Sequence, residues 1–163
     1  MAAREIGEMD MADIPISDSE QTLNEEDIRQ TERDLGTALP PEYRHFLLQH
    51  NGGRPERNYF QIEDGNGDSL IDWFLCIRPG DANDLASVVR MFQNRVPRTL
   101  LPIARDPFGN LICIAVSGEN VGKVYFWDHE EEVAEGEIPD YRNLHLVSES
   151  FDRFLESLTP LPE

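Results

Sequence analysis

The chain of 163 residues has 32 aspartates and glutamates against 14 lysines and arginines, which gives a formal net charge of −18. Nucleic acids and anionic membranes bind cationic protein groups that displace their counterions, so a surface this negative repels both. Direct nucleic-acid binding is nearly excluded. The length is sufficient for one domain with its own core, and no apolar run approaches the roughly 18 residues that span a membrane. Such a charge favours simple solubility or a basic protein partner.

The two cysteines, Cys76 and Cys113, lie in apolar stretches without CxxC spacing. This is typical of small core residues in a reducing compartment. The first residues also lack the charged and then apolar segments of a secretory signal. We therefore expect a cytoplasmic protein.

Residues 1–21 are polar, acidic and without periodicity, and we expect them to form a flexible acidic tail before a single domain over residues 22–163. The domain is predicted to begin with a helix within Leu23–Gly36. Asn24 is a suitable N-cap, acidic residues follow in the first turn, and Gly36 ends the helix.

Two further helices are predicted from proline positions and apolar periodicity. The second helix starts at Pro41 and ends at Asn51–Gly53, whose residues accept left-handed geometry. The third opens at Gly80–Asp81 and ends before Pro97. Their apolar stripes comprise Tyr43, Phe46, Leu47 and His50 on the second helix, and Leu85, Val88, Val89 and Phe92 on the third.

Short runs rich in β-branched and aromatic residues predict the strands. Asn58–Glu63 and Ser69–Ile77 are separated by a turn-forming segment and form a plausible hairpin. Leu100–Ala104, Leu111–Val116 and Lys123–Trp127 are separated by Gly- and Asn-containing loops and predict three consecutive antiparallel strands. The middle one is apolar on both faces, so it belongs inside a sheet covered by helices.

The last part of the chain predicts an acidic loop at Glu130–Asp140, a short strand at Tyr141–Val147 and a final helix. Ser148 or Ser150 would cap this helix. Helices that flank a consecutive set of strands favour an α+β fold over a parallel α/β architecture.

The first two helices and the segment Leu100–Glu130 together resemble the SUKH superfamily, which includes bacterial immunity proteins and fungal cell-wall assembly regulators. The likeness covers residues 22–158. Its positions in the first block are Ile28, Glu32, Leu35, Gly36, Leu39, Pro40, Tyr43, Phe46, Leu47, Asn51, Gly52 and Gly53. Those in the second block are Leu101, Pro102, Ile103, Ala104, Asp106, Gly109, Asn110, Ile112, Gly122, Val124, Tyr125, Phe126, Trp127, Asp128 and His129.

The resemblance implies a twisted, mainly antiparallel sheet with about four flanking helices and no catalytic centre. It also implies a protein-binding role. Bacterial relatives typically bind and neutralise a toxin domain, often a nuclease or nucleic-acid deaminase. Others act as regulatory adaptors, for example in cell-envelope or cell-wall assembly. A basic toxin domain is the partner that we expect, and the oligomeric state stays open.

No catalytic, cofactor or metal site is expected from the residues. Ser117 lacks the GxSxG context of a nucleophile, and Asp106 suits a turn better than an active site. Asp64, Asn66 and Asp68 have the first spacing of a calcium loop, but the later Gly and Glu are missing, which favours a hairpin turn. The histidines show no zinc spacing with each other or with cysteine: His45, His50, His129 and His145. A small hydrolase is therefore a distant alternative.

The candidate partner-binding residues centre on the third central strand. Tyr125, Phe126 and Trp127 alternate sides, so either both faces of the sheet are covered, which we favour, or an aromatic residue is exposed. In the second case Trp127 would be an interface anchor surrounded by acidic residues. The acidic loop alone is more often a solvated surface. The candidates are Trp127, Asp128, Glu130, Glu131 and Glu132, with Asp64, Asp68 and Trp73 as further residues.

Overall fold

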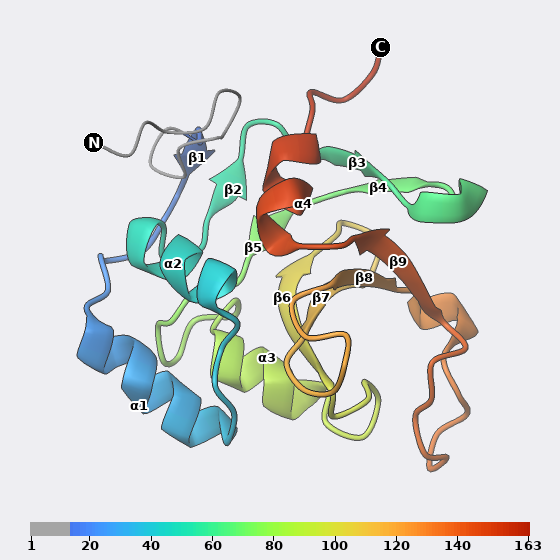
Figure 1. Cartoon of the computed structure of the whole chain (residues 1–163), viewed down its shortest axis with the longest axis horizontal. Coiled ribbons are helices and arrows are strands. Elements are labelled where there is room, and N and C mark those ends of the chain that lie inside the picture. Colours follow the sequence, from blue (N-terminus) through green and yellow to red (C-terminus); the bar gives the residue numbers. More distant parts are fainter. Residues whose placement is uncertain (1–13) are drawn as a thin grey trace.

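A five-stranded antiparallel sheet forms the centre of the computed structural model, which describes residues 14–163 (Figure 1). Its strands lie side by side in chain order: β5 (Trp73–Phe74), β6 (Leu100–Arg105), β7 (Leu111–Ala115), β8 (Val124–Trp127) and β9 (Leu144–Ser148). The three predicted central strands are confirmed as β6, β7 and β8. The last strand is also confirmed, although it begins at Leu144 rather than at Tyr141.

Both faces of this sheet are covered, as the apolar pattern of β7 predicts. Every residue of β7 is buried. On one face Trp127 packs edge-on against Phe92, which directly follows the helix α3 (Leu85–Met91). On the other face Phe126 lies 6.3 Å from Phe60, ring centroid to centroid. The expectation that helices flank consecutive strands is confirmed, and the fold is α+β.

Aromatic side chains fill the space between the second face and two helices, α2 (Pro41–Gln49) and α4 (Phe151–Ser157). In Figure 1, α4 lies in front of the sheet and α2 to its left. Phe46 contacts both Phe74 of β5 and Phe151 of α4, with ring centroids 4.9 and 5.2 Å apart. These buried rings hold the helices to the sheet.

The predicted helix caps account for three of the four α-helices in the described part of the chain. α1 (Glu25–Leu35) has a capping box at Asn24 and ends at Gly36 with a φ of 73°. α2 begins at Pro41, and Ser150 rather than Ser148 caps α4. The start predicted for α3 at Gly80–Asp81 is wrong, because Asp84 accepts the backbone N–H of Ser87 and so begins the helix there.

Two small antiparallel pairs complete the fold. The predicted hairpin is present as β3 (Tyr59–Gln61) and β4 (Asp68–Leu70), joined by a 3₁₀ turn, η2 (Glu63–Gly65). The second run is nevertheless split, because β5 leaves the hairpin and pairs with β6 in the main sheet. The other pair, β1 (Ile16–Ser17) with β2 (Arg54–Pro55), has no counterpart among the predicted elements.

The region predicted as a flexible tail is only partly described, since residues 1–13 lie outside the described residues. Residues 14–21 differ from the expectation because they lie against the domain. The Ser19 hydroxyl and the Glu20 amide donate to the carbonyls of Gly52 and Asn51, at 2.8 and 2.9 Å. A Cβ on Gly53 would stand 2.5 Å from the carbonyl oxygen of Ser17, so this close approach requires glycine.

Two buried polar residues among the SUKH-like positions connect distant segments. Asn51 donates to the carbonyl of Gln21 and accepts the amide of Ile77 at 2.7 Å. Asp106 accepts four hydrogen bonds, which come from the Ser69 hydroxyl, the Phe108 amide, and the amide and side chain of Asn110. The Asp106 carboxylate therefore stabilises its own turn and connects it to β4, which agrees with the turn-forming role predicted for this residue.

None of the helices within residues 14–163 combines the length and the apolar character needed to cross a membrane.

Candidate partner-binding surface

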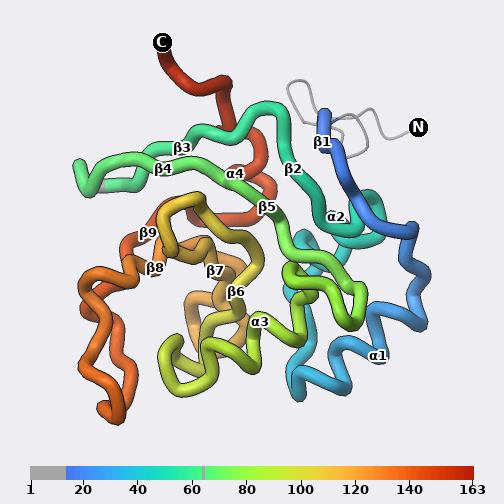
Figure 2. The backbone as a smooth tube through the Cα atoms, turned by 180° about the vertical axis from the view of Figure 1, so that it is seen from behind, coloured from blue at the N-terminus to red at the C-terminus, as the bar shows by residue number. Residues whose placement is uncertain are grey.

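The acidic loop connects β8 to β9 and extends away from the body of the molecule at one end, as the orange segment shows in Figures 1 and 2. Residues 128–143 contain seven carboxylates and one arginine, Arg142. Arg142 pairs with Asp140 and thereby lowers the pKa of that carboxyl. The remaining charge is strongly negative, so this loop attracts cationic groups.

Trp127 is not an exposed anchor, and this prediction is wrong. Its side chain is 0% exposed because its face of β8 is directed toward Phe92 at the end of α3. A partner could reach this ring only after local unfolding. The alternative that we favoured from the sequence, burial on both sides of the sheet, is confirmed for Phe126 and Trp127, while Tyr125 is half-buried.

The four acidic candidates have two different roles. Asp128 caps the 3₁₀ turn η3 (His129–Glu131) by accepting the amide of Glu130 at 2.9 Å. Glu132 is half-buried and pairs with Arg95, and this carboxylate raises the pKa of the arginine. Glu130 and Glu131 are exposed. These two are the more accessible to a partner, and Glu131 also pairs with His145 at 3.5 Å.

Two exposed apolar residues of the same loop were not among the candidates. Ile138 is 88% exposed and Tyr141 is 57% exposed. Single exposed apolar side chains are common on protein surfaces, so their exposure alone does not indicate a partner. These two stand out because both line the same groove. The isolated isoleucine between Glu137 and Pro139 is the signal that the sequence offers.

These two residues border an open groove of about 1100 Å³ between the loop, the C-terminal end of α1, α3 and β6. The hydroxyl groups of Tyr141 and Thr99 are hydrogen-bonded, which holds this part of the loop beside β6. Apolar residues that line the groove include Leu35, Val89, Phe92, Leu100, Ile138 and Tyr141. Charged residues of both signs complete the lining, with Asp34 and Glu137 opposed by Arg90 and Arg98. The groove thus offers an apolar area with a polar rim, as protein interfaces do.

The remaining candidates lie elsewhere. Trp73 is half-buried on β5, the edge strand opposite β9, where Arg54 stacks 5.1 Å from its ring centroid. Asp68 is exposed and accepts the hydroxyl of Tyr59 at 2.6 Å across the β3–β4 hairpin. The side chain of Asp64 lies outside the described part of the chain. Trp73 thus lies at the edge of the main sheet farthest from the acidic loop, whereas Asp68 belongs to a hairpin whose turn, η2, contacts β9.

The model of the SMI1 / KNR4 family (SUKH-1) matches residues 22–157. The chain belongs to this family. The superfamily resemblance is thereby confirmed, and membership is compatible with an immunity or a regulatory role. The SUKH family is generally non-enzymatic.

A curated relative is the SPbeta prophage-derived uncharacterized protein YokK of Bacillus subtilis (strain 168), which is 30% identical over 154 residues. The match covers 84% of this chain and 75% of YokK. A crystal structure of a protein from Pseudomonas syringae pv. tomato is 21% identical, with a TM-score of 0.48, and covers 75% of this chain and 82% of that one.

Proposed function

We propose that this SUKH-1 chain is an immunity-type protein, without enzymatic activity, that binds and neutralises a basic toxin domain. The observation that carries the proposal is the acidic loop with its exposed Ile138 beside a groove that is partly lined by apolar residues. Nuclease and deaminase domains have basic surfaces for phosphate groups, which an acidic surface can cover. A regulatory adaptor, for example in cell-envelope or cell-wall assembly, is the alternative that family membership also allows.

Charge and apolar contact contribute different parts of such binding. Opposite net charges raise the association rate by roughly 10- to 1000-fold at low ionic strength. Fast capture suits an immunity protein, since unbound toxin damages the cell at once. Exposed ion pairs add little affinity individually, so the lifetime of the complex depends on a desolvated anchor. Ile138 and Tyr141 supply that anchor in place of Trp127.

The experiment that tests this proposal is affinity capture of the tagged chain from its own cells at low salt, with partners identified by mass spectrometry. A basic nuclease- or deaminase-like domain that is released by raised salt would support the immunity role. Recovery of envelope or regulatory proteins instead would favour the adaptor. Gene neighbourhood gives an independent check, because an immunity protein is encoded beside its toxin.

A further inference from the structure

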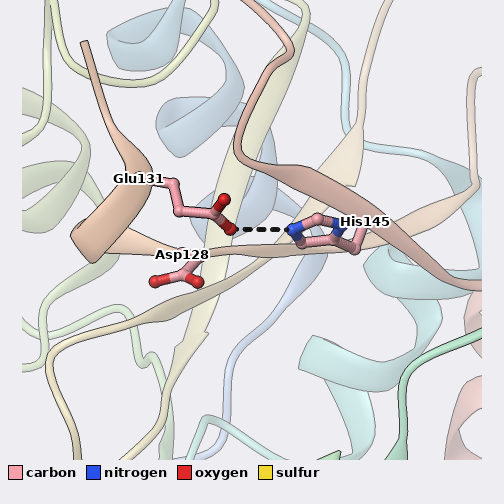
Figure 3. Close-up of side chains that lie close together, drawn as sticks. All are labelled: Asp128, Glu131 and His145. Carbon is pink, nitrogen blue, oxygen red and sulfur yellow. Dashed lines mark ion pairs between the residues drawn. The ribbon is translucent and has the colours of Figure 1, made fainter. Parts of the chain in front are cut away.

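Three side chains with metal-ligating atoms converge where β8 ends, outside the groove described above. They are Asp128, Glu131 and His145, and one ligand atom from each lies within 4.8 Å of the other two. Figure 3 shows the Glu131 carboxylate and the His145 imidazole directed toward each other, with the Asp128 carboxylate beside them. This mixed set combines an imidazole with two carboxylates.

The fold brings these residues together through two local regularities. Asp128 and Glu131 are three positions apart across η3, and side chains at this spacing eclipse in a 3₁₀ turn. Phe126 pairs with His145 in the sheet, and Asp128, two residues after Phe126, is directed to the same face. The amide of Asp128 also donates to the carbonyl of Asn143 at 3.0 Å, which continues the pairing of β8 with β9.

We propose that Asp128, Glu131 and His145 form a binding site for a divalent transition-metal ion such as Zn²⁺. His145 Nε2 and Glu131 Oε1 are 3.5 Å apart. Two ligands of a tetrahedral zinc ion, each bonded at about 2.0–2.2 Å, are about 3.4 Å apart, so this pair needs almost no movement. One oxygen of Asp128 accepts the Glu130 amide. A carboxylate has about four acceptor positions on its two oxygens, so Asp128 can also supply the third ligand.

The surroundings favour a cation that arrives from solvent. The Glu131 side chain is 57% exposed and that of His145 is 23% exposed, so the site is open on one side while the imidazole is held by the sheet. The two carboxylates match the double charge of the ion. Three protein ligands leave a fourth position for water or for a donor group of another molecule.

Metal binding would join the base of the acidic loop to β9, because Glu131 belongs to η3 and His145 to the strand. The loop would then be less mobile and locally less negative. This inference does not depend on the proposed function, because zinc binding is measured on the chain alone, without a protein partner.

Calorimetric titration of the chelator-treated full chain with zinc sulfate tests the site. We expect one ion per chain, with His145→Ala and Glu131→Gln each weakening binding by more than about 10-fold. Glu131 is exposed, so its substitution leaves the fold intact. His45→Ala, which removes an exposed histidine from α2, is the matched control and should bind as the unmodified chain does.

A second readout identifies the ligand directly. The imidazole resonances of His145 should shift in NMR spectra on addition of one equivalent of zinc, while those of His45 should not. Zinc binding that is unchanged in His145→Ala and Glu131→Gln, or absent at millimolar zinc, would overturn the proposal. So would a spectrum in which the His145 resonances stay in place.

Discussion

Arg95 joins the acidic loop to the core through Glu132. Its guanidinium donates two hydrogen bonds to this carboxylate, at 2.8 and 3.2 Å, across 37 residues of sequence. The same group lies 4.6 Å from the ring centroid of Phe92 and 5.6 Å from that of Trp127. Glu132 thus orients a cation that covers the edge of the buried aromatic pair, which is a structural role rather than a partner contact.

Substitutions of Arg95 and Glu132 should have non-additive effects on the free energy of unfolding. Glu132→Ala removes the carboxylate that orients Arg95, and because the pair is partly exposed we expect a loss of at most about 1 kcal/mol in the free energy of unfolding. Urea unfolding of Glu132→Ala, Arg95→Ala and the double variant measures the coupling. Strictly additive effects would show that the two side chains stabilise the fold independently.

Trp127 should matter for stability and not directly for binding. Trp127→Ala leaves a cavity against Phe92, and we expect a loss of about 3–5 kcal/mol in urea unfolding. Trp73→Ala is the matched comparison, and it should cost clearly less because Trp73 is half-buried at the sheet edge. A Trp127→Ala variant as stable as the unmodified chain but unable to bind its partner would contradict the burial assigned to this ring.

Charge reversal on the acidic loop should slow the capture of a basic partner. We expect the triple variant Glu130→Lys, Glu135→Lys and Glu137→Lys to lower the association rate by at least about 10-fold at low salt, because all three carboxylates are exposed. The control replaces Glu56, Glu156 and Glu163 by lysine, which changes the net charge equally but outside the loop. Equal rates for both triples in stopped-flow binding would remove the loop from the interface.

Ile138 should act on the lifetime of the complex rather than on its formation. Ile138→Ser removes an apolar side chain that is 88% exposed in the free protein, so stability should not change. The dissociation rate should rise by about 10-fold, the effect of losing about 1.4 kcal/mol of contact in the complex. Leu161→Ser, at another exposed apolar residue, is the control. A dissociation rate unaffected by Ile138→Ser would exclude this side chain as an anchor.

Both cysteines should be unreactive in the folded chain. Burial, with Asp81 as a second cause, raises the pKa of the Cys76 thiol to about 12, and burial also raises that of Cys113. Few thiolates therefore exist at pH 8, and a thiol reagent should label the folded chain far more slowly than the urea-unfolded chain. In the unfolded chain these thiols ionise near pH 9, whereas in the fold they stay protonated to a higher pH. The fold therefore keeps its full stability below pH 9 and loses stability as the pH rises above that value. Fast labelling without denaturant would contradict this.

Local patterns predicted much of the fold. The caps of α1 and the alternation in β6, β7 and β8 depend on residues a few positions apart, and both could be recognised in the sequence. The β1–β2 pair could not, because two-residue strands 37 positions apart carry no periodicity. The burial of Trp127 could not be predicted from β8 alone. An apolar strand with two covered faces gives no sign of which side is more deeply buried.

The candidate site was also predicted only where it depends on local sequence. The acidic composition of the loop could be recognised, and so could its place after an apolar strand. Which carboxylates are paired could not be predicted, because Arg95 lies 37 residues before its partner Glu132. The approach of His145 to Asp128 likewise depends on the register of β8 and β9, which spacing rules for histidine and cysteine do not consider.

Neutralisation itself is tested most directly by titrating the activity of the purified toxin domain recovered by capture with this chain. We predict that activity falls to background at one chain per toxin domain, that the loop triple variant needs a large excess, and that the control triple behaves as the unmodified chain. A toxin domain that forms the complex and stays fully active at saturating concentrations would contradict the immunity function.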